Sequence, residues 1–187
     1  YDGCPELGKH IIEQLIENEF DVGQSTRLPE ISDHWWSGVP HAFGFIYRQI
    51  MRDTVIPNVP VFTNTFFPPN QPTVARCYKF GKEVRKAVDS WDSNLKVAGF
   101  SSGGLSHFTI DEELDRQFLD AIESGDEAQI LAIPNDLLVS GTSELKNWIA
   151  LAGFIADTDL ESTAVDYIPC YRSAAGTGNA MAFAIWN

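Results

Sequence analysis

Basic side chains are scarce in this sequence. Of 187 residues, 13 are Lys or Arg and 26 are Asp or Glu, so the formal net charge at pH 7 is −13. No run of Lys or Arg offsets this excess locally. Because an anionic surface repels polyphosphate backbones and anionic lipid headgroups, the composition argues against a nucleic-acid or membrane-surface role.

Cysteine pairs and long apolar runs are absent as well. Cys4, Cys77 and Cys170 are widely spaced and form no CxxC pair, which indicates neither a disulfide framework nor a thiolate zinc site. The cysteine usage favours a reducing compartment, and we expect a cytoplasmic protein. No stretch approaches the roughly 18 uninterrupted apolar residues of a membrane-spanning helix.

Apolar residues, by contrast, are abundant. Hydrophobic residues make up 44% of the chain and aromatic residues 12%, which is enough for a buried core and too much for a disordered chain. The sequence has no internal repeat, no low-complexity segment and no obvious linker. We therefore expect residues 1–187 to form one domain.

Apolar spacing predicts alternating helices and strands. Three- and four-residue steps indicate amphipathic helices over residues 5–20 and 74–91. Short apolar runs predict four strands, over residues 59–67, 96–101, 167–171 and 181–186. This alternation predicts an α/β fold with a mixed central sheet covered by helices on both faces. We expect the last two strands to form an antiparallel hairpin around residues 176–178.

Two more helices are predicted from capping residues. Thr109 and Glu112 fit a capping box that opens a helix ending at Gly125. Thr142 or Ser143 caps the other helix.

The turn that ends in His107 is the first candidate for chemistry. Open α/β proteins bind ligands at loops that follow sheet strands, and Gly103 and Gly104 allow a ligand to approach the backbone closely. A histidine in such a turn can take and return a proton near neutral pH. Spacing alone also allows a surface-loop histidine after a glycine turn, and by itself favours it.

Glu144 lies in the first turn of its predicted helix. A carboxylate there stabilises the helix dipole. It could also be a metal ligand held at a rigid helix start, because oxygen donors combined with imidazoles suit divalent iron, manganese or zinc.

Two other segments have weaker signals. His34 and His41, among aromatic residues, either line a pocket for a flat ring or belong to a packed loop. Residues 170–178 could form an anion nest in which Arg172 binds a carboxylate, although a hairpin turn explains their glycines equally well. A serine nucleophile is disfavoured, because no serine has glycines two positions before and after it.

Three ordered motifs resemble those of the class III extradiol ring-cleavage dioxygenases. They are Gly103-Gly104-Leu105-Ser106-His107, Asp111-Glu112-Glu113-Leu114-Asp115 and Ser143-Glu144-Leu145-Lys146-Asn147-Trp148. More narrowly, most of the chain is similar to the LigB-type catalytic subunits of protocatechuate and gallate dioxygenases. Each motif alone is weakly specific, and the ordered set is moderately specific.

The resemblance implies a LigB-like catalytic domain with a non-haem Fe(II), or Mn(II), held by two histidines and one glutamate. Glu144 matches the glutamate ligand. His107 matches the histidine beside the metal that acts as acid–base catalyst, and His34 matches a pocket histidine that lies against the substrate. Arg172 or Ser173 would bind a substrate carboxylate.

Both iron-binding histidines of that family lie N-terminal to the region that this sequence matches. Nothing here matches them, and the first residue is Tyr1. We therefore expect residues 1–187 to be the C-terminal part of such a domain, with the two histidines supplied by upstream sequence. A replacement of these ligands by His34 and His41 would need a different loop geometry.

Two functions from different classes remain open. One is an extradiol dioxygenase that opens the ring of a protocatechuate- or gallate-like acid with dioxygen, as a homodimer or with a small accessory subunit. The other is a non-catalytic binding or regulatory module on the same fold. A net charge of −13 does not attract an anionic aromatic acid, so steering would depend on local groups such as His34, Arg172 and the metal.

Overall fold

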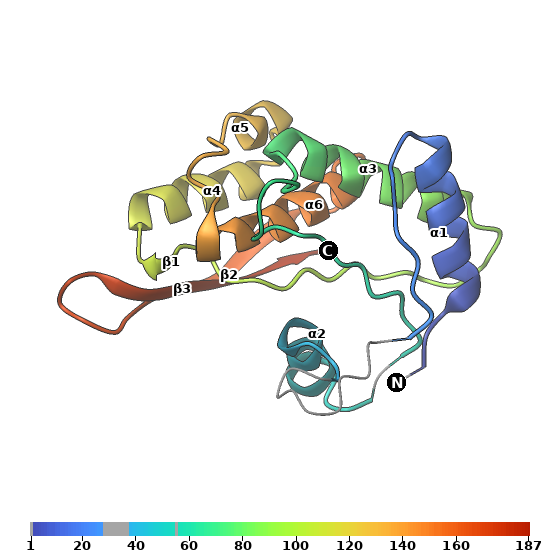
Figure 1. Ribbon diagram of the computed structural model, residues 1–187, viewed down its shortest axis with the longest axis horizontal. Helices are drawn as coiled ribbons and strands as arrows, with labels where there is room; N and C mark the ends of the chain where they lie inside the picture. Colours follow the sequence, from blue (N-terminus) through green and yellow to red (C-terminus); the bar gives the residue numbers. More distant parts are fainter. Residues whose placement is uncertain (1, 28–37, 55) are drawn as a thin grey trace.

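The computed structural model describes residues 2–27, 38–54 and 56–187 (Figure 1). Its elements in chain order are α1 (Pro5–Glu17), α2 (His41–Phe45), the π-helix η1 (Ile46–Ile50), α3 (Val74–Ser90), β1 (His107–Thr109), α4 (Glu112–Ser124), α5 (Glu127–Leu131), the 3₁₀ helix η2 (Ser140–Glu144), α6 (Leu145–Ile155), β2 (Ser162–Tyr171) and β3 (Thr177–Trp186).

The described strands form a three-stranded antiparallel sheet in the order β1-β3-β2. The short strand β1 pairs His107 with Asn179 and Thr109 with Thr177. The β2–β3 hairpin turns over residues 172–176, and Gly176 adopts a positive φ of 79°. The predicted α/β class and the closing hairpin are confirmed, and the sheet is antiparallel where we had expected a mixed one.

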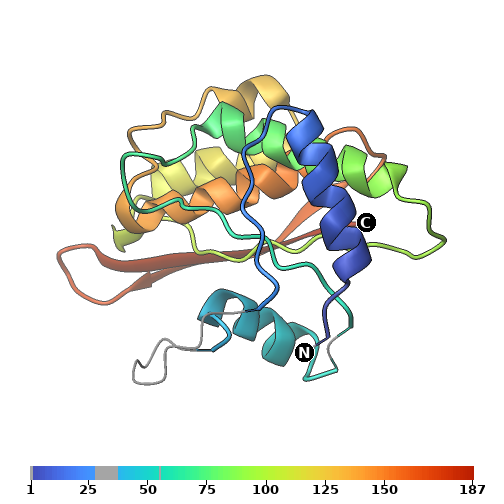
Figure 2. The same ribbon diagram turned by 45° about the vertical axis from the view of Figure 1, so that its right-hand side comes forward.

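Helices α3, α4, α5 and α6 form a layer over one side of this sheet (Figures 1 and 2). The core between them contains side chains that are completely buried, among them Leu105, Phe118, Leu145 and Ile149. Helix α1 packs against α3, and α2 and η1 lie on the opposite side of the sheet in both views. The predicted helices over 5–20 and 74–91 correspond to α1 and α3.

Two predicted strands are not strands in the structure. Residues 59–67 and 96–101 are extended, but neither segment forms a backbone–backbone hydrogen bond with another described residue. Pro60 has no N–H to donate to a ladder. An apolar run becomes a strand only when a neighbouring strand satisfies its backbone groups, and these segments have no such neighbour within the described ranges.

The predicted caps are also displaced. The α4 cap is Asp111, whose side chain accepts a hydrogen bond from Leu114 N, whereas Thr109 belongs to β1. Neither Thr142 nor Ser143 caps a helix with its side chain, because both lie inside η2, which leads directly into α6. The end of α4 is as predicted, with Gly125 in the left-handed conformation.

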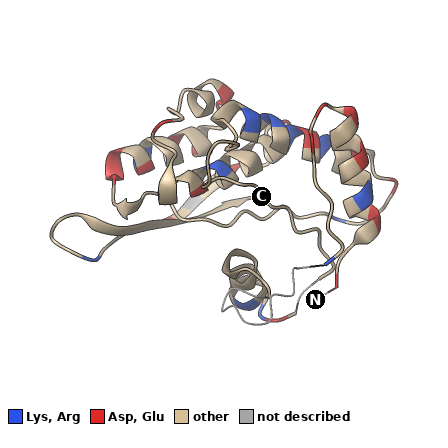
Figure 3. Cartoon of the chain, in the orientation of Figure 1, with Lys and Arg blue, Asp and Glu red and all other residues tan. Residues whose placement is uncertain are grey.

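Charged side chains are concentrated on the helices, and the β2–β3 hairpin has few (Figure 3). Within the part of the chain that the structure describes, no helix has both the length and the apolar character needed to cross a bilayer.

Candidate functional site

His107 and Glu144 lie together although 37 positions separate them in the sequence. The distance from His107 Nε2 to Glu144 Oε2 is 3.7 Å, and the two side chains are 14% and 35% exposed. His107 begins β1, and Glu144 is the last residue of η2. The structure thus brings together the two residues that the sequence analysis singled out for proton transfer and metal binding.

The glycine turn (residues 102–107) is shaped around the Glu144 carboxylate. Gly104 N donates a hydrogen bond of 2.8 Å to Glu144 Oε2. Gly103 has a φ of 152°, in the region that favours glycine, and a Cβ there would lie 3.0 Å from Glu144 Cβ. A side chain at position 103 would therefore press on the acid that the turn holds.

Helix α6 holds the same turn through two further hydrogen bonds. Trp148 Nε1 donates to Gly103 O at 2.9 Å, and Asn147 Nδ2 donates to Ser102 O at 3.1 Å. These two residues are the Asn-Trp pair of the third sequence motif. The pair binds the backbone carbonyls of the glycine turn, which fixes that turn relative to Glu144.

Two contacts fix the position and the tautomer of His107. Its backbone N donates to Thr142 Oγ1 at 3.1 Å, and its ring Nδ1 lies 2.7 Å from Leu105 O. A carbonyl oxygen only accepts hydrogen bonds, so Nδ1 carries the proton and Nε2 has the free lone pair in the neutral ring. The atom that faces Glu144 is therefore the one that can gain and lose a proton.

Gly141 is a site residue that sequence reasoning missed. A Cβ at this position would collide with His107 Cβ. The signal for it was a glycine three residues before Glu144, but spacing alone does not show which side chain a glycine accommodates.

The described residues do not assemble a complete metal site. In residues 2–27, 38–54 and 56–187, no group of three His, Cys, Asp or Glu side chains lies close enough together to hold a metal ion. Glu144 offers one carboxylate beside one imidazole, which is fewer than the three protein ligands of a two-histidine, one-carboxylate iron site. Within the described residues, the pair by itself therefore does not make a metal site.

The other predicted site residues lie apart from this pair or outside the described residues. Arg172 and Ser173 belong to the exposed turn of the β2–β3 hairpin, where Ser173 Oγ bonds to Thr177 Oγ1 at 2.7 Å. That turn projects beyond the helical layer (Figure 1). His41 begins α2, and His34 lies outside the described residues.

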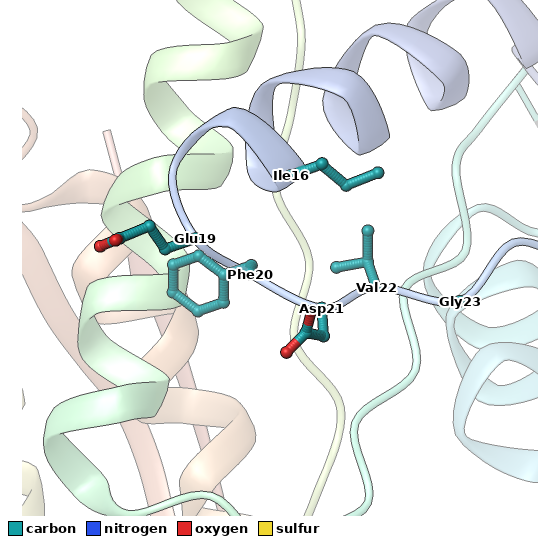
Figure 4. Close-up of a pocket in the computed structure, with 6 residues that line it drawn as sticks. All are labelled: Ile16, Glu19, Phe20, Asp21, Val22 and Gly23. Atoms are coloured by element: carbon teal, nitrogen blue, oxygen red, sulfur yellow. The ribbon is translucent and has the colours of Figure 1, made fainter.

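An open cleft of about 660 Å³ lies at the C-terminal end of α1 (Figure 4). Its lining comes from the segment that runs from Ile16 to Gly23. None of these residues belongs to the glycine turn or to η2, so the cleft is separate from the His107–Glu144 pair.

Comparison with known proteins identifies the family. A family model described as the catalytic LigB subunit of aromatic ring-opening dioxygenase matches residues 1–180. The chain belongs to the LigB family. One relative, the gallate dioxygenase of Pseudomonas putida, is 43% identical to this chain over 130 residues. That alignment covers 64% of this LigB chain and 35% of the relative, so the chain matches about a third of the relative's length.

Proposed function

We propose that this LigB-family protein is an extradiol dioxygenase that uses dioxygen to open the ring of a catecholic or phenolic acid. Its substrate class would be that of gallate or protocatechuate. The family match and the similarity to a gallate dioxygenase support the reaction class. The observation that carries the proposal is the His107–Glu144 pair, because it places an imidazole lone pair next to a carboxylate held by a backbone N–H.

In this proposal His107 is the acid–base catalyst. Nδ1 is bonded to Leu105 O, so the ring cannot turn without losing that hydrogen bond. Nε2 therefore points in one direction and can accept a proton from a phenolic hydroxyl, which it later returns. A fixed base is more effective than a mobile one, because the cost of orienting it is met before the substrate binds.

Glu144 is the proposed ligand of a non-haem Fe(II), with Mn(II) as the alternative. Its Oε2 is engaged by Gly104 N, which leaves Oε1 available and fixes the orientation of the carboxylate. The two remaining protein ligands would come from outside the described residues. The chemistry that Fe(II) supplies in such a site is Lewis acidity toward phenolic oxygens and binding of dioxygen.

His34, Arg172 and Ser173 are the proposed substrate contacts. The acidic chain disfavours an anionic substrate at long range, so recognition of its carboxylate depends on local donors such as Arg172. We further propose a cytoplasmic protein that forms a homodimer or binds a small accessory subunit.

Two substitutions test the roles of the pair in the intact protein. We expect Glu144→Ala to lose bound iron, measured by metal analysis. His107→Phe should keep the iron and lower the rate of oxygen uptake with gallate or protocatechuate by about 10²-fold or more, as expected for loss of general acid–base catalysis. Glu123→Ala, which removes an exposed carboxylate of α4, is the control.

Full iron content in Glu144→Ala would rule out the ligand assignment. Oxygen uptake by His107→Phe at the rate of the unsubstituted protein would rule out the acid–base assignment. Failure of the unsubstituted, iron-loaded protein to consume oxygen with a panel of catechols and trihydroxybenzoates would instead favour a non-catalytic module.

A further inference from the structure

A buried carboxylate that the proposed chemistry does not use binds Ser106, the residue directly before His107. Asp115, in the first half of α4, is 0% exposed. Its Oδ1 accepts a hydrogen bond of 2.8 Å from Ser106 N, and its Oδ2 accepts hydrogen bonds from Ser106 Oγ at 2.7 Å and from Tyr167 OH at 3.0 Å. A buried acid is costly unless donors surround it. These three donors hold the Asp115 carboxylate in one position.

Asp115 holds the glycine turn at the residue directly before His107. Asp115 binds Ser106 twice, and Ser106 Oγ accepts a further bond from Asp111 N at 2.9 Å. Residue 107 follows at once, and the carbonyl that holds its ring belongs to Leu105. Both neighbours of Ser106 therefore determine where the imidazole lies.

The protonation states fit this arrangement. Burial, together with the hydrogen bond to Asp115, raises the pKa of Tyr167 above its ordinary value, so its hydroxyl remains a donor. Burial also raises the pKa of Asp115, and the hydrogen bonds from Ser106 and Tyr167 oppose that rise.

The same helix provides a natural comparison, because a second tyrosine–carboxylate contact lies one turn earlier. Tyr171 OH donates to Glu112 Oε1 at 2.8 Å, and Arg116 donates to Glu112 Oε2 at 2.7 Å. This contact also joins α4 to β2, but no described contact connects Glu112 to the glycine turn. Both acids thus accept a hydrogen bond from a tyrosine of β2, but of the two only Asp115 also binds the glycine turn.

We infer that Asp115 is a positioning residue for His107. Its carboxylate holds Ser106, and Ser106 fixes the backbone from which the imidazole projects and the carbonyl that selects its tautomer. Asp115 does not touch the reacting atoms. The inference rests on the proposed role of His107, and it adds a residue that acts through the turn.

The test compares two substitutions of the same kind in the intact, iron-loaded protein. Asp115→Asn removes the charge of the carboxylate. Its amide N–H₂ then faces at least one of the hydroxyls that donate to Asp115 in the unsubstituted protein. Glu112→Gln makes the matched change at the exposed contact. We expect Asp115→Asn to lower kcat at least about tenfold through misplacement of the base. Its KM should stay within about twofold, since substrate binding is not altered, and its iron content should not change.

A second measurement does not depend on turnover. Nitrogen NMR of histidine-labelled protein reports the tautomer of each ring, and His107→Phe identifies the His107 signals. We expect the Nδ1-protonated form in the unsubstituted protein and in Glu112→Gln, and a mixture of tautomers in Asp115→Asn. If Asp115→Asn does not fold, Tyr167→Phe removes one hydrogen bond from the same carboxylate and should shift the tautomer in the same direction.

An unchanged tautomer and kcat in the variant that folds would overturn the inference. Equal losses in Glu112→Gln would also overturn it, because they would show a general effect of the α4–β2 contact. If the unsubstituted protein consumes no oxygen, the proposed function fails, and the tautomer measurement still decides whether Asp115 positions His107.

Discussion

Two regions of the molecule use their apolar side chains in opposite ways. In the packed region, which we define as α3, α4, α6 and the face of the sheet that they cover, side chains such as Phe118 and Leu145 are completely buried. In the extended region, residues 56–67 and 92–101, large apolar side chains such as Phe62, Phe67 and Leu95 are exposed. Both regions contain large apolar side chains, so the burial of such a side chain here depends on its neighbours.

The candidate site lies where the extended region enters the packed one. The second extended segment leads into the glycine turn, which α6 holds through Trp148 and Asn147. The packed region therefore supplies the rigidity that a positioned acid–base group requires.

Removing a buried aromatic ring should show the difference between the regions most strongly. Phe118 is 0% exposed and packs edge-to-face on Trp148, with ring centroids 6.2 Å apart. We expect Phe118→Ala to lower the free energy of unfolding by about 3–5 kcal/mol, because it leaves a cavity in the core. Denaturant unfolding monitored by tryptophan fluorescence measures this loss.

The matched control is Phe67→Ala in the extended region, where the side chain is 70% exposed. We expect a change within about 0.5 kcal/mol, as for surface positions. A loss as large as that of Phe118→Ala would contradict the comparison, because it would mean that Phe67 is buried against a partner in solution.

Adding a methyl group should have a smaller effect, whose sign differs between the packed region and the short helix α2. At Gly153, where α6 crosses α3, a Cβ would collide with the carbonyl oxygen of Tyr78. We expect Gly153→Ala to cost about 1–3 kcal/mol, since two helix backbones must separate. Thermal unfolding gives the change.

Gly44 of α2 is the counterpart outside the packed region, because no atom from another described part of the chain lies within 4 Å of where its Cβ would stand. Alanine there should stabilise the protein by about 0.5–1 kcal/mol, since glycine loses more backbone entropy in a helix. Destabilisation by Gly44→Ala would show that α2 has an unseen neighbour.

Local patterns predicted the packed region well and the extended region poorly. Helices α1 and α3 follow from apolar spacing, because a helix satisfies its own backbone hydrogen bonds. Residues 59–67 have the composition of a strand, but a strand needs a partner that lies elsewhere in the sequence. The short elements α2 and η1 were missed for a related reason, since five residues contain too little periodicity to detect.

The same limit applied to the candidate site. His107 and Glu144 were identified from their motifs, but their 3.7 Å approach depends on how the glycine turn packs against η2, which no spacing reveals. Asp115 was missed as a separate candidate. The available signal was an acid on the apolar face of α4, between Leu114 and Phe118, where a carboxylate must find buried donors.

Replacing a buried charge in the packed region should have a small effect that depends on pH. Lys146 of α6 is 4% exposed, and burial lowers its pKa. Its neighbour Cys77 does not neutralise it, because burial raises the pKa of that thiol to about 11. Between the lowered pKa and the ordinary value near 10.4, the unfolded chain binds more protons than the folded protein, so the contribution of Lys146 to stability rises with pH. Its cost is therefore complete on the acidic side of that window.

We expect Lys146→Met to stabilise the protein by about 1 kcal/mol below this window, as when a buried charge is replaced by an apolar side chain. The gain should disappear as the pH approaches about 10.4, where the lysine is neutral in both states. Lys96→Met, at an exposed position of the extended region, should show no such pH dependence. Differences in Tm between each variant and the unsubstituted protein from pH 6 to pH 10 measure both. A gain that grows with pH would mean that the packed region stabilises the Lys146 ammonium, and burial would then not be the dominant effect on it.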